Sequence, residues 1–432
     1  MSKIKSHYYP LTIIGILFFV FGFLTWINGI LIPYFQICLD LTNFQASLVA
    51  FATYIAYFVM ALPSAYILKF TGYRRGMVLG LIIMALGTLL FVPAAYTRLY
   101  AVFLTGLFIT GSGLALLQTA ANPYVAIIGP IESTAQRIGF MGLANKTAGI
   151  LSLTLLGSIF LFKADDIIAS VRNVIPSEKS RILDGYALKI VNPYLIISII
   201  LLLLAIMINF SKIPEINEEK KKENISAIEI MPKPSLFHYP HLILGVLGLF
   251  FAAACEVLPI DGIIIYGRAL GIPIEEARHF STYTLIAMLL GYLASTILIP
   301  KFLSQNRALQ LCSLLGIILA TCSFFCSGIL SIIFLILTGF GSAMLWGTIW
   351  GLSLRGLGKH TKTGSAMLLM AVIGGGIFPV IFGRLIDKYP SYPQNAVLLL
   401  IPCYFVLLFF SSYGYRLQSW KAIPKNKLKM VQ

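Results

Sequence analysis

Apolar stretches long enough to cross a lipid bilayer recur from one end of the chain to the other. The hydrocarbon core of a bilayer is about 30 Å thick, and a helix that crosses it needs roughly 20 mostly apolar residues. We count twelve such stretches. The first six cover residues 10–34, 45–70, 75–95, 99–128, 138–162 and 193–210. The second six cover residues 240–267, 280–302, 308–325, 330–354, 363–386 and 396–415.

These stretches predict transmembrane helices, because their apolar residues run on continuously and lack the alternation of a membrane β-barrel strand. The composition agrees, with 58% hydrophobic and only 11% charged residues among 432, far from the usual values for soluble domains. The first stretch follows Lys3 and Lys5, as in a signal peptide, but its apolar run is too long and no small-residue cleavage site follows. We therefore expect an all-α membrane protein of twelve helices whose first helix is retained.

The net charge of +16 could reflect nucleic-acid binding or the excess of Lys and Arg in the cytoplasmic loops of a membrane protein. The positions of the basic residues along the chain distinguish the two explanations. With a cytoplasmic amino terminus, twelve spans return the carboxyl terminus to the same side, where excess Lys and Arg belongs. The basic residues of that side would be Lys69, Arg74, Arg75, Arg137, Lys220, Lys221, Lys222, Lys301, Arg307, Arg355, Lys359, Lys362, Arg416, Lys421, Lys425, Lys427 and Lys429. The acidic residues that largely offset the basic ones in the loop between spans five and six are Asp165, Asp166, Glu178 and Asp184. The charge thus indicates a multi-pass protein with both termini cytoplasmic and no nucleic-acid partner.

A polar, charge-dense stretch, SKIPEINEEKKKENISAIEIMPKPS, separates spans six and seven and is typical of a flexible linker. It divides the chain into a bundle at residues 1–210, a cytoplasmic linker at 211–236, a second bundle at 237–415 and a cytoplasmic tail at 416–432. Three short similarities relate the bundles: IIGIL with ILGVL, GSGLALLQ with GFGSAMLW, and GFMGLANKTAGI with the segment from Gly364. Their offsets are 243 − 13 = 230, 339 − 111 = 228 and 364 − 139 = 225. Two pseudo-symmetric six-helix bundles are predicted, an arrangement that transporters build around a central site.

Gln118 and Asn122 lie four residues apart, so in a helix they form one polar stripe that can face the bundle interior. Unpaired amides are costly in hydrocarbon, so the stripe needs neighbouring helices or a wet cavity that holds a polar ligand. Bonds between helices are the structural alternative for either residue alone. Further amides and indole rings in the spans favour a neutral polyhydroxylated ligand, whose hydroxyls bond amides while its C–H face stacks on rings. The predicted sugar-binding residues are Asn28, Gln118, Asn122, Asn145, Trp346 and Trp350, with Trp26 as a further ring.

The charged residues inside the spans are Lys146, Glu256 and Asp261. Each costs about 3 kcal/mol or more unless it is paired or wet. Lys146 lies nine residues past Arg137, or roughly 13 Å along a helix, near the midplane. The carboxylates lie in ACEVLPIDG, where Pro259 and Gly262 can unwind the helix and expose carbonyls. A lysine of one bundle and a carboxylate of the other could form a pair that is remade during transport, or a static pair that holds the bundles in register. The carboxylates could also bind sodium or take up a proton.

The sequence gives little support to other chemistries. The six cysteines show no spacing of metal-ligand pairs, and His279 and His360 have no second ligand residue nearby. The glycine run IGGGIF follows no strand and lacks the lysine of a phosphate loop, so close helix packing explains it better than nucleotide binding. We find no nucleophile paired with a base. We expect neither an enzyme nor a bound cofactor or metal.

Several long motifs resemble the major facilitator superfamily, and within it the fucose permease and glucose/galactose transporter group. NGILIPYFQICLDLTNFQASLVAFATYIAYFVMALPSAYIL is similar to that group's first two helices, LQTAANPYV to its fourth-helix motif, and LGKHTKTGSAMLLMAVIGGGI to its loop between helices ten and eleven. The resemblance covers most of the chain apart from the linker and the tail. It implies the major facilitator fold and a cation-linked monosaccharide symporter of a bacterial inner membrane, alternating between outward-open and inward-open states.

The chain departs from the fucose permease pattern where that pattern handles protons. In the pattern an aspartate follows the asparagine matched by Asn28, and a glutamate begins the fourth-helix motif. Here Gly29 and Gln118 stand at those places. The fifth-helix glutamine of the pattern falls at Gly142, and Lys146 replaces a small neutral residue. The predicted cation-coupling residues are Lys146, Glu256 and Asp261, and proton-coupled, sodium-coupled and uncoupled transport all stay open.

Asn122 and Asn145 match polar positions of the same pattern. The sequence as a whole predicts a transporter that imports a neutral monosaccharide of the fucose, glucose or galactose type by alternating access. We expect it to act as a monomer in the lipid bilayer. One alternative is an exporter of drugs or metabolites, which would favour a cavity with fewer amides; another is an uncoupled sugar facilitator.

Overall fold

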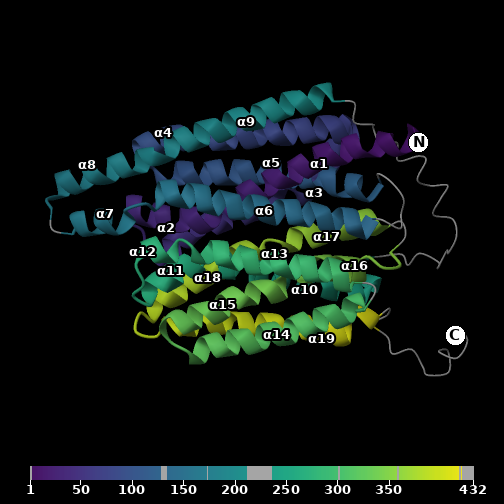
Figure 1. Ribbon diagram of the computed structural model, residues 1–432. Coiled ribbons are helices and arrows are strands. Elements are labelled where there is room, and N and C mark those ends of the chain that lie inside the picture. Colours follow the sequence, from purple (N-terminus) through teal and green to yellow (C-terminus); the bar gives the residue numbers. More distant parts are fainter. Residues whose placement is uncertain are drawn as a thin grey trace, which may run out of the picture.

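The computed structural model of the protein describes residues 2–127, 134–172, 174–211, 236–299, 302–357, 360–417 and 420. Helices are the regular structure throughout these ranges (Figure 1). Before the predicted linker they are α1 (Ser2–Trp26), α2 (Asn28–Cys38), α3 (Asn43–Leu89), α4 (Phe91–Thr97), α5 (Tyr100–Ile127), α6 (Thr134–Phe160), α7 (Ala164–Ser170), α8 (Pro176–Ala187), η2 (Leu188–Ile190) and α9 (Val191–Phe210). After it they are η4 (Leu236–His238), α10 (Pro240–Asp261), α11 (Ile263–Ala269), α12 (Ile274–Ala277), α13 (Phe280–Leu298), α14 (Gln305–Phe325), α15 (Gly328–Ser342), α16 (Leu345–Ser353), α17 (Thr361–Ala371), α18 (Gly374–Lys388), η6 (Pro393–Leu399), α19 (Leu400–Ser412) and η7 (Gly414–Arg416).

Eleven segments of the described chain are long and apolar enough to cross a membrane, so the protein is a multi-pass membrane protein. One of them, Asn43–Thr97, has 55 residues, which is enough for two crossings of roughly 20 residues each. Within it Gly72 has φ 74° and ψ 174°, far from helical values. A Cβ atom on Gly76 would lie 2.1 Å from Cδ2 of Leu68, so the chain folds back at Gly72. This one long segment covers the second and third predicted spans, which is why eleven segments are found where twelve spans were predicted.

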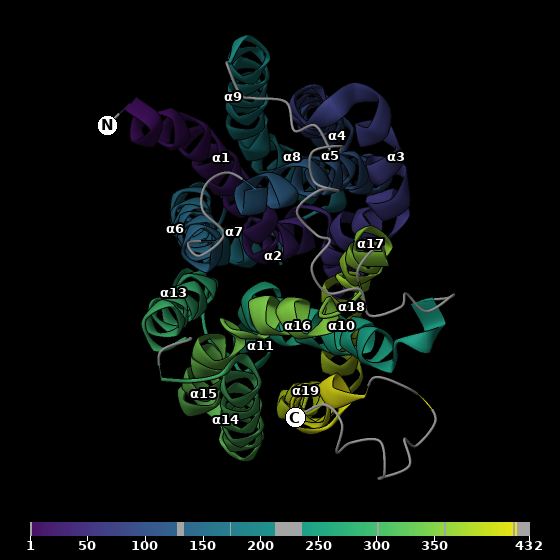
Figure 2. The same ribbon diagram turned by 90° about the vertical axis from the view of Figure 1, so that its right-hand side faces the viewer.

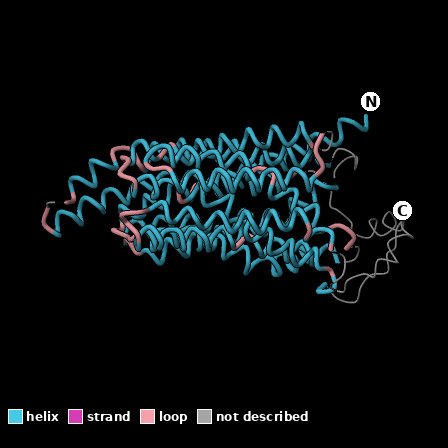
Figure 3. Tube along the Cα trace, turned by 90° about the horizontal axis from the view of Figure 1, so that it is seen from below, coloured by secondary structure: helices cyan, strands magenta, loops and turns pink. Residues whose placement is uncertain are grey.

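The helices run side by side in two groups, one formed by α1 to α9 and the other by α10 to α19 (Figures 1 and 2). α6 packs against α13, and α3 packs against α17 and α18, so these helices join the groups. α1 begins at the same end of the bundle at which α19 ends, and most loops lie at the two ends (Figure 3). Residues 212–235 of the predicted linker and 421–432 of the predicted tail lie outside the described residues.

Small residues let some helices touch through their backbones. A Cβ atom on Gly22 of α1 would lie 1.8 Å from the carbonyl oxygen of Asn145 on α6. Close backbone approach through glycine is a common way for membrane helices to pack. The contact brings α1 and α6 together at Asn145, one helical turn before Trp26 in α1. On the outside of the bundle, large apolar side chains such as Phe210 and Phe325 are exposed, which suits contact with lipid tails.

The first long helix of each group is broken near its middle. α1 ends at Trp26 and α2 begins at Asn28, while α10 ends at Asp261 and α11 begins after Gly262. The breaks lie at Ile27 and Gly262, which are 262 − 27 = 235 residues apart, close to the offsets of the sequence similarities. Interrupted helices at matching places of two repeats often border the binding site of a transporter.

Hydroxyl groups of α13 satisfy carbonyls at the break between α10 and α11. Pro259 and Gly262 end the regular helix there, as the sequence suggests. Ser281 Oγ donates to the carbonyl oxygen of Ile260 at 2.6 Å, and Thr284 Oγ1 donates to that of Pro259 at 3.1 Å. The break is therefore held by side chains and is part of the packed structure.

Carboxylates tie the two groups together at the end away from the start of α1. Asp387 of α18 accepts hydrogen bonds from the backbone N–H groups of Asn43 and Phe44, at 3.2 and 2.8 Å, and from Asn43 Nδ2 at 2.7 Å. Asn43 and Phe44 begin α3, so a carboxylate of the second group satisfies free N–H groups of a helix in the first. Arg268 Nη1 donates to Gln36 Oε1 at 2.6 Å at the same end.

A reciprocal arrangement joins α7 and α12. The carboxylate of Asp165 in α7 accepts from the backbone N–H groups of Ile274 and Glu275, which begin α12, at 3.2 and 3.1 Å. The carboxylate of Glu275 accepts in turn from the N–H of Lys163, which precedes α7, at 3.0 Å. Each short helix thus supplies the anion for the start of the other. This end of the bundle is closed by direct bonds between the two groups.

Candidate functional site

An ion pair joins the two groups deep in the bundle. Lys146 Nζ of α6 lies 2.6 Å from Glu256 Oε1 of α10, and both side chains are buried. The sequence left open which carboxylate Lys146 would face, and the structure pairs it with Glu256. A buried pair of this kind offsets much of the desolvation cost of each charge. It connects a helix of the first group directly to a helix of the second.

Aromatic rings and an amide surround the Lys146 ammonium group. Its Nζ lies 3.8 Å from the centroid of the Trp26 ring and 5.7 Å from that of Tyr292, within range of a cation–π attraction. Trp26 Nε1 donates to Oδ1 of Asn145 at 3.0 Å. Asn145 Nδ2 donates to the backbone carbonyl of Phe18 at 3.4 Å. The sequence predicted that Asn145 and Lys146 belong to the site, and the structure places them beside one another around Trp26.

Gln118 belongs to a second polar group, with tyrosines of α3. Its Nε2 donates to the hydroxyl of Tyr57 at 3.0 Å. Tyr57 is buried and stacks on Tyr54, with ring centroids 6.1 Å apart. Gln118 and Asn122 are both half-buried on α5. The amide stripe is therefore partly tied to a neighbouring helix and partly accessible.

Asn28 and Asp261 lie at the two helix breaks and are fully buried. Asn28 Oδ1 accepts from Thr53 Oγ1 at 3.5 Å, while its Nδ2 has no partner among the described residues. Neither carboxylate oxygen of Asp261 has a partner there. Both residues were predicted for the site on the basis of the sequence, and both hold unused hydrogen-bonding capacity.

Trp346 and Trp350 stack on each other along α16, with ring centroids 4.7 Å apart and planes inclined by 21°. Both rings are half-buried. Gly347 between them is exposed, and a Cβ atom there would meet no atom within 4 Å. The two indoles form one aromatic surface on the second group, as their spacing of four predicts.

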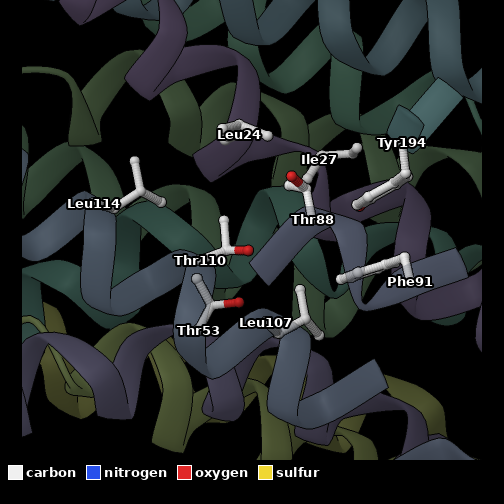
Figure 4. A pocket seen from close by; sticks show the side chains of 9 residues that line it. All are labelled: Leu24, Ile27, Thr53, Thr88, Phe91, Leu107, Thr110, Leu114 and Tyr194. Carbon is white, nitrogen blue, oxygen red and sulfur yellow. The ribbon is translucent and has the colours of Figure 1, made fainter. Parts of the chain in front are cut away.

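Two cavities are described. One, of about 10 Å³, lies inside the first group (Figure 4) and is close to the size of a single water. The other, of about 290 Å³, is an open apolar groove between α10 and α19, where Leu247, Phe405 and Phe409 are exposed. Neither is lined by a predicted site residue.

Among the described residues no three His, Cys, Asp or Glu side chains are arranged to hold a metal ion.

Comparison with known proteins assigns the family. The family model of the Major Facilitator Superfamily matches residues 14–379. The chain belongs to this superfamily. Several of its relatives are named as sugar transporters.

The curated relatives include two kinds of sugar transporter from the superfamily. The glucose/galactose transporter of Brucella abortus biovar 1 (strain 9-941) is 30% identical over 417 residues, which cover 96% of each chain. The L-fucose-proton symporter of Escherichia coli (strain K12) is 30% identical over 415 residues, covering 95% of this chain and 94% of the symporter. The crystal structure of FucP in the outward conformation matches with a TM-score of 0.71 and 28% identity, covering 95% and 99% of the two chains.

Sequence reasoning missed the tyrosines of the site. Tyr54 and Tyr57 lie on α3, and Tyr292 lies on α13 against the lysine. A Cβ atom on Gly142 would lie 2.8 Å from the Tyr292 ring, so the absence of a side chain at 142 makes room for it. The spacing of three between Tyr54 and Tyr57 was a usable signal, since it puts both on one helical face.

Proposed function

We propose that the protein is a secondary transporter that imports a neutral monosaccharide of the fucose, glucose or galactose type by alternating access. The observation that carries the proposal is the Lys146–Glu256 pair, which joins the two groups of helices beside Trp26 and Asn145. Relatives with 30% identity over nearly the whole chain are named as transporters of glucose and galactose or of fucose.

The proposed sugar contacts come from both groups. Amides donate to and accept from sugar hydroxyls, and indole rings stack on the C–H face of a sugar ring. The proposed binding residues are Asn28, Gln118, Asn122, Asn145, Trp346 and Trp350. In this conformation several of these side chains form hydrogen bonds within the protein, such as the bond from Gln118 to Tyr57. When the sugar binds, its hydroxyl groups would replace these protein partners.

The proposed coupling residues are Lys146, Glu256 and Asp261. A cation that neutralises a buried carboxylate changes the attraction between the two groups of helices, which links ion binding to their rearrangement. The bonds at Asp165, Glu275 and Asp387 hold one end of the bundle closed in this conformation. Opening that end requires all of them to break.

The decisive test is uptake into vesicles that contain the purified protein. Labelled fucose, glucose, galactose and N-acetylglucosamine are offered separately, with a proton gradient, a sodium gradient or none. We expect counterflow of at least one hexose, and accumulation under one of the gradients. Counterflow without accumulation under either gradient would indicate an uncoupled facilitator. If no sugar exchanges under any condition, sugar transport is rejected and export of another metabolite becomes the better hypothesis.

A further inference from the structure

The carboxyl group of Asp261 is isolated in the protein interior. The residue is 0% exposed, and neither carboxyl oxygen has a hydrogen-bond partner in the described part of the chain. Glu256, on the same helix, differs because it binds Lys146. A buried carboxylate with neither counter-ion nor hydrogen bond is strongly disfavoured, and such a group takes its neutral form instead.

Two other buried side chains bring unused donors to the same region. Asn28 Nδ2 and the Tyr54 hydroxyl both lack partners among the described residues. Asn28 precedes Gly29, where a Cβ atom would lie 3.1 Å from the carbonyl oxygen of Ile260. A Cβ atom on Gly375 would lie 3.4 Å from the Tyr54 ring and 2.9 Å from Val257, one helical turn before Asp261. Three elements, α2, α3 and α10, thus gather polar groups that are unpaired in this conformation.

Few charges act on this position from the elements packed around it. Tyr54 lies on α3, and the charge of Glu256 on α10 is matched by Lys146 of α6. α11 carries Arg268, which binds Gln36, and α18 carries Asp387, which binds the start of α3. The remaining ionisable residues on these elements are Tyr34 and Cys38 on α2, Tyr57, Tyr66, Lys69, Tyr73, Arg74 and Arg75 on α3, His241 and Cys255 on α10, Tyr266 on α11, Tyr283 and Tyr292 on α13, and Arg384 and Lys388 on α18. None of the described cations forms an ion pair with Asp261.

The ligands around Asp261 suit a proton better than sodium. A hard cation needs several oxygen ligands, but the carbonyls of Pro259 and Ile260 already accept bonds from Thr284 and Ser281. The amide oxygen of Asn28 accepts from Thr53. The group that Asn28 leaves free is a donor, which repels a metal cation and attracts a carboxylate oxygen.

We propose that Asp261 is the proton-binding site of the transporter and that its carboxyl group is protonated in this conformation. The inference rests on the proposed function, because it names the ion that accompanies the sugar. When the proton leaves, the O–H bond breaks, the electron pair stays on the carboxylate, and the proton passes to water on the side to which the bundle has opened. Asn28 and Tyr54 can then donate to the new carboxylate and lower its cost.

The first experiment compares the wild type with Asp261→Asn in vesicles. An inward gradient of one pH unit supports roughly tenfold accumulation by a carrier that moves one proton per sugar. We expect the wild type to accumulate sugar under this gradient, and Asp261→Asn to exchange sugar in counterflow without accumulating it. Sugar-induced proton uptake, followed with a pH indicator, should be lost in the same variant. Asp166→Asn changes an exposed carboxyl group of α7 and should behave as the wild type.

Full proton-driven accumulation by Asp261→Asn would overturn the proposal, and so would accumulation by the wild type that follows a sodium gradient alone. A second measurement does not depend on transport. The infrared absorption of a protonated carboxyl group at neutral pH should be present in the wild type and absent from Asp261→Asn, and identical spectra would also overturn the assignment. A wild type that exchanges no sugar refutes the proposed function, while the infrared comparison still decides whether Asp261 is protonated.

Discussion

Lys146 is the residue on which the central polar group depends. Its ammonium ion is buried and has three stabilising neighbours: the Glu256 carboxylate, the Trp26 ring and, further off, the Tyr292 ring. The carboxylate supplies most of the compensation, because opposite charges at short range attract far more strongly than a cation and a ring. Removing either charge therefore leaves the other without its main partner.

We expect the single variants Lys146→Met and Glu256→Met each to destabilise the protein by about 3–5 kcal/mol, the usual cost of an uncompensated buried charge. The double variant should lose much less than the sum, since two apolar side chains of similar volume replace the pair. Thermal unfolding in detergent, measured for all four proteins, provides the comparison. Losses that simply add would show that the two charges are stabilised independently.

At the scale of the helix, the bonds that close one end of the bundle follow a common rule. In each case a carboxylate of one group satisfies the free N–H groups at the start of a helix in the other. Asp387 serves α3, Asp165 serves α12, and Glu275 serves the start of α7. These bonds can form only when the two groups meet at this end, so they stabilise one conformation of the bundle.

Replacing Asp387 by Ala removes the anion from the start of α3. Loss of such a cap costs about 1 kcal/mol, so the amides of Asn43 and Phe44 should exchange hydrogen roughly fivefold faster. Hydrogen exchange followed by mass spectrometry checks this. If the three carboxylates act as one closure, the amides of Ile274 and Glu275 should also exchange faster, although they contact Asp165 instead. Lys388→Ala, at an exposed neighbouring position, is the matched control and should change neither peptide.

On the scale of the whole molecule, the described chain begins and finishes at the same end of the bundle (Figure 1). An even number of crossings produces that arrangement, and the long segment Asn43–Thr97 supplies two of them if it turns at Gly72. Described basic residues at this end include Arg74 and Arg75 just after the turn in α3, Arg307 at the start of α14 and Arg416 in η7, so we predict that this end faces the cytoplasm. The helices α7 and α8 project from the opposite end.

Reporter fusions test this orientation. A fluorescent protein fused after Gln432 should fluoresce, because it folds in the cytoplasm. Alkaline phosphatase, which is active only outside the cytoplasm, should be active when fused after Glu178 in α8 and inactive when fused after Lys221 in the linker. Phosphatase activity at Lys221 would mean that the positive residues lie outside and that the orientation is reversed.

The sequence by itself determined the helical architecture and the approximate positions of the spans, because each span must satisfy its backbone within a run of apolar residues. It also singled out Lys146, Glu256 and Asp261, since charges are rare in such runs. Only the tertiary structure decided that Lys146 pairs with Glu256, that Tyr292 fills the space beside Gly142, and that Asp261 has no partner among the residues described. Those facts depend on how helices distant in sequence turn toward one another, and a periodic pattern fixes the face of a helix without fixing its neighbour.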